Sequence, residues 1–164
     1  MDRLPNEILS DAALDEIEAK PRRAKNPIDH WTPAVLLERA AYLRKLAKHG
    51  DGSAGEVLKE YPQHAIHLLV RSRNGGAELH ENFADLFFVL EGRAALVTGG
   101  AVAEARTIGP GEIRGSSVEG GVRQELRAGD VAHVPAGLPH QMLVSGDKFV
   151  TCIVLKIQQE AQKP

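Results

Sequence analysis

Three stretches of the sequence carry acidic and imidazole groups that could act together. Glu78 and His80 lie two residues apart, so on an extended strand both side chains project from the same face. Asp85 opens a strongly apolar segment, where a carboxylate has to be paired, hydrogen-bonded or bound to a cation. His140 follows a turn rich in proline and glycine, which fixes where the next strand begins. Because such groups bind cations and transfer protons, the three stretches need a common explanation.

The segment that ends at Gly92 resembles the first motif of the cupins, a superfamily of small β-barrels. That motif runs Gly, five residues, His-x-His, three or four residues, Glu, six residues, Gly. Counting back from Gly92 puts Asp85 at the position of the Glu. Four residues further back, His80 stands at the second His and Glu78 at the first.

A second cupin motif follows near the other end of the chain. It runs Gly, five residues, Pro-x-Gly, two residues, His, three residues, Asn, and it matches without gaps at Gly129, Pro135, Gly137 and His140. The resemblance spans roughly residues 66–156. It implies an all-β fold, a cupin-like antiparallel β-barrel of the double-stranded β-helix or jelly-roll type.

The sequence departs from the cupin pattern at several positions: Glu78 replaces the first His, Asp85 is one methylene shorter than Glu, Ser72 stands at the opening Gly and Val144 at the terminal Asn. An alternative register takes His80-x-Asn82 as the His-x-His pair. It leaves two residues before Asp85, which is fewer than the cupin pattern has.

The resemblance implies a metal site inside the barrel, held by Glu78, His80, Asp85 and His140. Two imidazoles and two carboxylates suit a divalent transition metal such as Fe, Mn, Ni or Zn. Two His and one carboxylate already give the arrangement with open positions that non-haem iron oxygenases use. The second carboxylate is then a fourth ligand or a general base, so Glu78 and Asp85 are the candidate catalytic groups. A metal-free pocket with a satisfied polar cluster is the alternative.

Short strands at near-regular spacing predict the barrel without the motifs, since such spacing is typical of all-β sandwiches and barrels. We expect a cupin barrel domain over residues 61–164. Within it, the glycine-rich segment 109–121 is interpreted as a long loop between strands. Gly99-Gly100 predicts a hairpin between residues 94–98 and 101–108. The other expected strands are 65–71, 85–90, 122–127, 131–135, 140–144 and 148–157.

Residues 1–60 predict a mostly helical N-terminal extension that packs on the barrel. One helix is expected over residues 9–20. A second has Thr32 as N-cap, Pro33 in its first turn and Gly50 as a left-handed stop. Its apolar stripe consists of Leu36, Ala40, Leu43 and Ala47.

Further residues are candidates for the pocket. His133 precedes the Pro-x-Gly turn, and Arg114 lies in the 109–121 loop, where it could hold a substrate carboxylate. His64 and His67 have opposite parity, so at most one of them faces the barrel interior. Cys152 stands in an apolar strand and is interpreted as a small core residue.

Composition narrows the class of protein. The 164 residues contain 43% hydrophobic and 26% charged residues, which is typical of one globular domain, and the net charge is −2. The chain lacks the broad positive charge of a nucleic-acid-binding surface, and it has no apolar run long enough to span a membrane. The first 25 residues lack the apolar middle of a signal peptide, and the single cysteine fits a reducing compartment. We therefore expect a cytoplasmic protein without nucleic-acid or membrane partners, and a homodimer formed through sheet edges and the extension.

The functional hypothesis is a metal-dependent cupin enzyme that acts on a small polar organic molecule in the barrel. A dioxygenase is the first expectation, because the ligand set resembles the facial triad; isomerases, decarboxylases and epimerases also occur among cupins. The alternative is a non-catalytic small-molecule-binding or sensory cupin without metal. A DNA-reading N-terminal domain is disfavoured, because residues 1–60 contain more acidic than basic residues.

Overall fold

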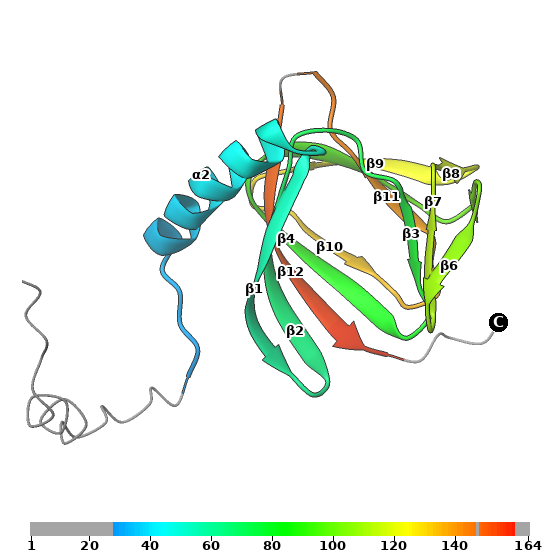
Figure 1. Cartoon of the computed structure of the whole chain (residues 1–164), viewed down its shortest axis with the longest axis horizontal. Helices are drawn as coiled ribbons and strands as arrows, with labels where there is room; N and C mark the ends of the chain where they lie inside the picture. The colour runs from blue at the N-terminus through cyan, green and yellow to red at the C-terminus, as the bar shows by residue number, and fades with distance from the viewer. Residues whose placement is uncertain (1–27, 147, 160–164) are drawn as a thin grey trace, which may run out of the picture. The chain divides into compact units, whose positions relative to one another are not determined.

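The computed structural model describes residues 28–146 and 148–159 (Figure 1). The helix expected over residues 9–20 lies outside this range. The described part of the unit Trp31–Pro164 contains helix α2 (Pro33–His49) and strands β1 to β12. The strands are β1 (Ser53–Tyr61), β2 (His64–Arg71), β3 (Ala77–His80), β4 (Phe83–Thr98), β5 (Ala101–Val102), β6 (Arg106–Gly109), β7 (Glu112–Gly115), β8 (Val118–Glu119), β9 (Val122–Arg127), β10 (Val131–Val134), β11 (His140–Leu143) and β12 (Val150–Gln158).

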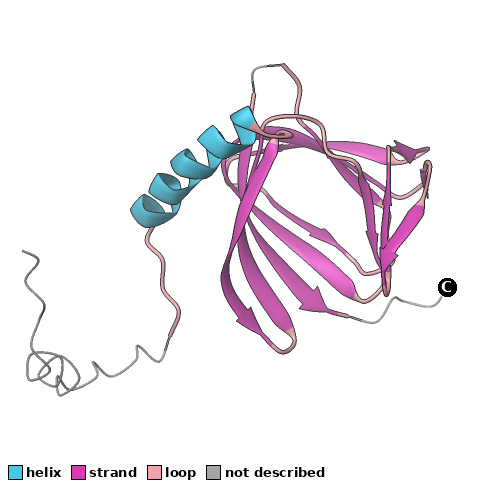
Figure 2. Cartoon of the chain, in the orientation of Figure 1, coloured by secondary structure: helices cyan, strands magenta, loops and turns pink. Residues whose placement is uncertain are grey.

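One antiparallel sheet runs in the order β1-β2-β12-β4-β11-β3-β7-β6, and β9 and β10 also pair with β4. Strand β4 divides this sheet, because its first part pairs with β12 and β10 and its last part with β9 and β11. We call β1, β2, β12, β10 and residues 83–92 layer A. Layer B consists of residues 93–98, β9, β11, β3, β7 and β6. Figure 2 shows both layers curving around a common interior, which confirms the expected antiparallel β-barrel.

Gly92 is the point at which β4 passes from one layer to the other. Its φ is +79°, and a Cβ at this position would lie 2.0 Å from the carbonyl oxygen of Phe149. Both the left-handed backbone and this close approach exclude a side chain. The final glycine of the first motif therefore has a physical role, since it lets a single strand serve both layers.

Side chains alternate between the barrel interior and helix α2 along layer A. In β2, Leu68 and Val70 are fully buried under α2, whereas His67, Leu69 and Arg71 line the interior. In β12 the inner core contains Val150, Cys152 and Val154. Cys152 is a core residue, as expected, and burial raises the pKa of its thiol to about 12.

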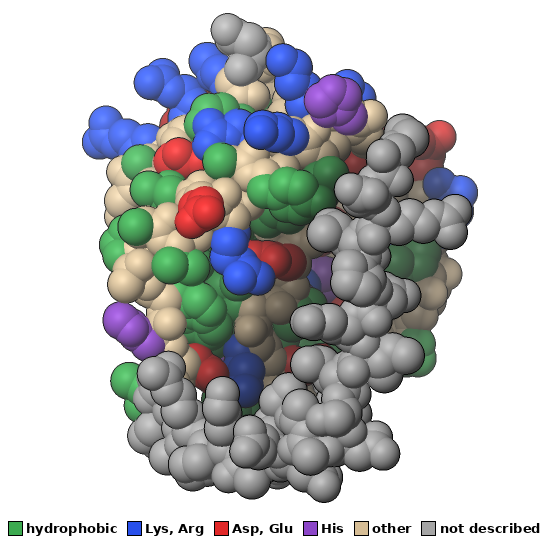
Figure 3. Space-filling view, turned by 60° about the vertical axis from the view of Figure 1, so that its left-hand side comes forward, with side chains coloured by type: hydrophobic (Ala, Val, Ile, Leu, Met, Phe, Trp, Pro, Cys, Tyr) green, Lys and Arg blue, Asp and Glu red, His purple; other side chains and the backbone are tan. Residues whose placement is uncertain are grey.

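Helix α2 begins and packs as its sequence predicts. The Thr32 hydroxyl accepts a hydrogen bond from the Val35 amide at 3.3 Å. Ala40, Leu43 and Ala47 are buried against Leu68 and Val70 of β2. Figure 3, turned so that the side carrying α2 comes forward, shows Lys and Arg side chains gathered toward the top of this face.

The end of α2 differs from the expectation. Gly50 has a φ of −101° and is not left-handed; its amide bonds to Leu46 O at 2.9 Å. Gly52, with a φ of +95°, takes the left-handed conformation instead, and its amide bonds to Ala47 O at 3.1 Å. The chain therefore turns two residues later and enters β1 directly.

Three expectations about strands need correction. The helical extension does not run to residue 60, because Ser53–Tyr61 is β1 and pairs with β2. The segment 109–121 is not a long loop, since it holds β7, β8 and the end of β6. The hairpin at Gly99-Gly100 does not form: β5 pairs with β8, while the end of β4 pairs with β9 and β11. Among the described residues, no helix has the length and apolar character to cross a membrane.

The Gly92→Ala variant tests the passage between layers. We expect it to lower the free energy of unfolding by more than about 2 kcal/mol, because a left-handed alanine would also meet the Phe149 carbonyl. Gly99→Ala is a matched control, since Gly99 has a φ of +80° and a Cβ added there would meet nothing within 4 Å. Urea unfolding of both variants measures the difference, and equal losses would contradict this role for Gly92.

Candidate metal centre

Four side chains predicted from the sequence converge in the barrel interior. Glu78, His80, Asp85 and His140 each offer one ligand atom, and these atoms lie within 4.8 Å of one another. Glu78 and His80 come from β3 in layer B, and His140 stands opposite Glu78 in the neighbouring strand β11. Asp85 comes from layer A. The group therefore forms only where the two layers face each other.

The distances place one carboxylate between the two imidazoles. His80 Nε2 lies 3.3 Å and His140 Nε2 lies 3.4 Å from Asp85 Oδ2. Glu78 Oε2 is 3.4 Å from His80 Nε2 and 4.0 Å from His140 Nε2. His80, Asp85 and His140 are buried, while the Glu78 side chain is 30% exposed. Glu78 is thus the member of the group that remains accessible.

Hydrogen bonds to the far side of each ring hold the imidazoles in place. His80 Nδ1 lies 2.7 Å from Glu112 Oε2, its cross-strand neighbour in β7. His140 Nδ1 lies 3.2 Å from the Leu138 carbonyl, which can only accept, so Nδ1 carries the hydrogen. Both Nε2 atoms consequently face the centre of the group, the arrangement that proteins use to orient metal-binding histidines.

An unpartnered nitrogen supports the fit of a metal ion. His140 Nε2 is buried and has no hydrogen-bond partner among the described residues. A buried lone pair without a partner costs free energy unless a proton or cation meets it. Two imidazole nitrogens and two carboxylates suit a divalent transition metal, so these residues fit such an ion.

Lys156 also reaches this group, which we did not expect from the sequence. Its Nζ lies 2.8 Å from Asp85 Oδ1 and 3.0 Å from His80 Nε2. Lys156 is the direct cross-strand neighbour of Asp85 in β12. At 3.0 Å only one of the two nitrogens can supply the hydrogen between them. Because Nζ contacts both Asp85 and His80, the lysine brings a positive charge to two groups that a metal would also use as ligands.

The charges around the two carboxylates stabilise their ionised forms. Burial alone would raise the pKa of Glu78, but the adjacent imidazole of His80 and the charge of Arg114 lower it to about 2. Burial likewise opposes ionisation of Asp85, yet the adjacent imidazoles of His140 and His80 and the charge of Lys156 hold its pKa well below the usual range. Both groups are therefore anions at neutral pH and compatible with a bound cation.

His80 shows the opposite balance. Burial lowers its pKa, but the adjacent carboxylates of Asp85 and Glu78 outweigh this and raise the pKa to about 9, although the charge of Lys156 acts against them. The two carboxylates thus favour a cation at the position between them, whether it is a proton or a metal ion.

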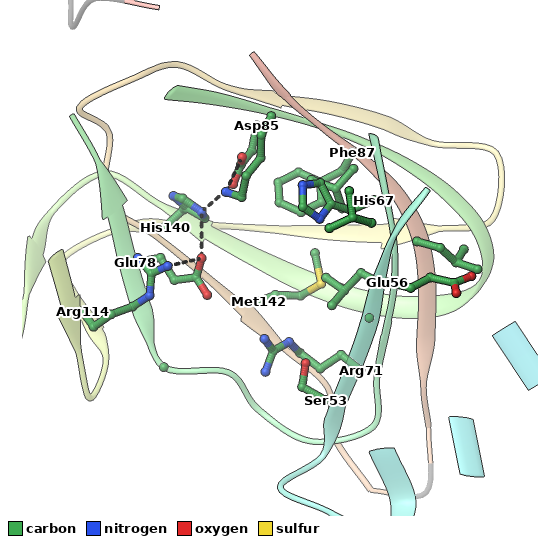
Figure 4. Close-up of a pocket in the computed structure, with 17 residues that line it drawn as sticks. Ser53, Glu56, His67, Arg71, Glu78, Asp85, Phe87, Arg114, His140 and Met142 are labelled. Carbon is green, nitrogen blue, oxygen red and sulfur yellow. Dashed lines mark hydrogen bonds and ion pairs between the residues drawn. The ribbon is translucent and has the colours of Figure 1, made fainter. Parts of the chain in front are cut away.

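A cavity of about 360 Å³ adjoins the group (Figure 4). Glu78, Asp85 and His140 form one end of it. Its wall includes apolar side chains of both layers and the basic residues Arg71, Arg114 and Lys156. This volume is large enough for a small organic molecule.

The other candidate residues have different positions. Arg114 lines the cavity and lies 3.2 Å from Glu112 and 3.8 Å from Glu78. His133 is exposed and lines a separate depression with Asp130 and Leu138, so it does not face this cavity. Asn82, the partner in the alternative register, is exposed beyond the end of β3.

Of the two histidines of opposite parity, His67 lines the cavity, and its pKa is lowered by burial and by the charge of Lys156. His64 stacks on Tyr61, with ring centroids 4.8 Å apart. The parity argument from the sequence therefore agrees with the structure, which assigns the inward position to His67.

Comparison with known proteins gives likeness in structure alone. No family model and no curated protein matches the sequence. The solved structure of TT1209 from Thermus thermophilus matches with a TM-score of 0.52 and 16% identity, over 74% of this chain and 93% of that one. The Cnp3 cupin domain of Schizosaccharomyces pombe matches with a TM-score of 0.49 and 13% identity, over 65% of each chain. A Klebsiella pneumoniae protein with a double-stranded β-helix domain matches with a TM-score of 0.49 and 17% identity, over 67% of this chain and 80% of that one.

At these identities the likeness concerns the fold. The fold assignment rests on the strand pairing of this chain, in which Gly92 and His140 occupy the positions that the two motifs imply. Gly92 joins the layers, and His140 begins the strand after the Pro-x-Gly turn. With its two antiparallel layers around an internal cluster of histidines and carboxylates, the chain has a cupin-like antiparallel β-barrel fold.

Proposed function

We propose that the protein binds a divalent transition metal through Glu78, His80, Asp85 and His140 and acts as an enzyme on a small polar organic molecule. The observation that carries this proposal is the convergence of four ligand atoms within 4.8 Å beside a cavity of about 360 Å³. The unpartnered His140 Nε2 supports it. Mixed nitrogen and oxygen ligands suit Fe, Mn, Ni or Zn.

The two carboxylates differ in what they can reach. Asp85 is 3% exposed and accepts from Lys156, so its role is that of a ligand. Glu78 is also a ligand, but it lines the cavity and is the carboxylate that can contact a bound molecule. A metal ion at this position supplies positive charge and open coordination positions next to the cavity.

A dioxygenase is the reaction that we propose to test first. Two imidazoles and one carboxylate on one side of an ion are the ligand pattern of non-haem iron oxygenases. Isomerases and lyases are the other reaction types compatible with such a centre.

A second candidate function is that of a metal-free binding or sensory protein. Lys156 favours it, because Nζ already gives Asp85 and His80 a cationic neighbour. In this case the cavity binds its ligand without catalysis. The two functions differ in which cation meets Asp85, so metal binding separates them.

The wider setting of the protein belongs to the same proposal. A homodimer formed through sheet edges, a cytoplasmic location and the absence of nucleic-acid partners all remain predictions. Among the described strands, β1 and β6 end the sheet, and their outer edges are available for such a dimer.

Metal analysis tests the ligand set. After reconstitution with Fe(II), Mn(II), Ni(II) or Zn(II) and removal of excess ion, we expect about one ion per chain. His140→Ala should lose the ion, because it removes one of the two imidazole ligands. His133→Ala is the matched control and should retain it, since His133 is exposed outside the cavity. Absence of bound metal after all four treatments would favour the metal-free function.

Oxygen uptake tests the reaction type. With the Fe(II)-loaded protein and a panel of small polar organic molecules, we expect substrate-dependent oxygen consumption that His140→Ala abolishes. Turnover of a substrate under anaerobic conditions would instead indicate an isomerase or lyase.

Lys156→Met tests the competition between lysine and metal. Without metal, the variant should unfold at a lower urea concentration, because Asp85 loses its closest cation. With Zn(II), stability should recover, and the ion should bind about tenfold more tightly or better than to the unmodified chain, since a competing charge is gone. Lys45→Met, on the exposed side of α2, is the control. If zinc restores no stability to Lys156→Met, Lys156 and the metal do not share a site.

A further inference from the structure

Three acidic and three basic side chains line the cavity, but they do not all pair with one another. Glu56 pairs with Arg39, which is not part of the lining. Glu78 lies 3.8 Å from Arg114, and Asp85 lies 2.8 Å from Lys156. Arg71 also lines the cavity, but no carboxylate pairs with it among the described residues. Its Nε is buried without a hydrogen-bond partner in that part of the chain. The cavity therefore contains one guanidinium whose charge and hydrogen-bond donors are unmatched.

The backbone holds this guanidinium in a defined place. Arg71 ends β2 between Ser53 of β1 and Val150 of β12, on the inward-facing side of the strand. A Cβ at Gly75 would lie 2.8 Å from Arg71 Nη1 and 2.9 Å from Cζ, so the guanidinium packs directly against this glycine. Figure 4 shows the Arg71 side chain reaching into the cavity near Met142.

An unmatched guanidinium that is half-buried, with its Nε fully buried, favours an anion as its partner. Leaving such a group without an acceptor costs free energy, whereas a carboxylate can accept two parallel N–H bonds from it. A carboxylate also carries the single negative charge that balances one guanidinium. A phosphate monoester carries up to two charges and would need a second unmatched cation.

We propose that Arg71 binds a carboxylate of the molecule that enters the cavity, and that this molecule is a small organic monocarboxylic acid. The proposal deepens the proposed function and rests on it for the identity of the cavity as the active site. Phe87, Met142 and Val154 line the cavity and give the acid an apolar surface for its carbon skeleton. Its other end meets Glu78, Asp85 and His140.

Arg71 takes over the role that the sequence suggested for Arg114. The guanidinium of Arg114 already contacts Glu112 at 3.2 Å and Glu78 at 3.8 Å. Its charge is therefore used within the protein, where it stabilises the ionised form of Glu78. Arg71 has no such contact in the described chain.

Binding of a matched set of probes tests the proposal. The probes are 4-methylpentanoate, the neutral 4-methylpentanamide and 4-methylpentyl phosphate, titrated against the full chain and followed by NMR, including the Arg71 Nε–H signal. The titrations are done with chelator-treated protein and with Zn(II)-loaded protein. We expect the acid to bind at least about tenfold more tightly than the amide and to shift the Nε–H signal.

Three variants locate the contact. Arg71→Gln should weaken binding of the acid about tenfold and leave binding of the amide unchanged. Arg71→Lys keeps the charge and loses the paired donors, so its affinity for the acid should lie between those of the unmodified chain and Arg71→Gln. Arg123→Gln removes an equal charge from an exposed site and should bind like the unmodified chain.

Gly75→Ala gives a second, independent test. The added methyl group would displace the Arg71 guanidinium, so binding of the acid should weaken while zinc content stays the same. This variant keeps the proposal testable even if Arg71→Gln fails to fold, which urea unfolding reports.

Some results would overturn the proposal. These are equal binding of acid and amide, tighter binding of the phosphate ester, or an acid affinity that is unchanged in folded Arg71→Gln. If the acid binds through Arg71 in chelator-treated protein and the protein retains no metal, the proposed metal-dependent function is wrong, but the proposed role of Arg71 is supported. If the protein retains metal and the acid binds equally well to Arg71→Gln, only the proposed role of Arg71 is wrong.

Discussion

A buried negative charge, that of Asp85, is the constraint on which the rest of the site depends. Asp85 is 3% exposed in the interior between two sheet layers. An ionised carboxylate in such a position is strongly disfavoured unless cations and hydrogen-bond donors surround it. Lys156 comes from the same layer, whereas His80 and His140 come from the opposite one. The partners of Asp85 therefore meet only where the two layers face each other.

Much of this site was predictable, because it depends on spacing within short segments. The period of two along a strand puts Glu78 and His80 on one face, and the Pro-x-Gly turn sets the position of His140. Helix α2 was predictable for a similar reason, since Thr32, Pro33 and its apolar stripe are local signals.

The residues that the sequence did not reveal depend on which face of a strand turns inward. Lys156 continues the inward series of Val150, Cys152 and Val154, and Arg71 continues that of His67 and Leu69. The sequence alone does not predict which side chains of β2 and β12 face inward, because that depends on which face of these strands α2 covers. The same uncertainty applied to His133, which the structure places on the exposed face of β10.

Other elements escaped notice because their partners are distant in the chain. Strands β5 and β8 have two residues each, and they pair with one another across the intervening β6 and β7. Strand β1 directly follows a helix, and its residues are extended because they pair with β2. Such strands are specified by tertiary pairing rather than by local propensity.

The central claim is that two imidazoles from layer B and a carboxylate from layer A bind one ion. Crystals of the protein grown with Mn(II) and measured for anomalous scattering test it most directly. The account predicts one strong peak within about 2.0–2.3 Å of His80 Nε2, His140 Nε2 and an oxygen of Asp85, with Lys156 Nζ moved away. A map without a peak there, with Lys156 Nζ still between Asp85 and His80, would contradict the account.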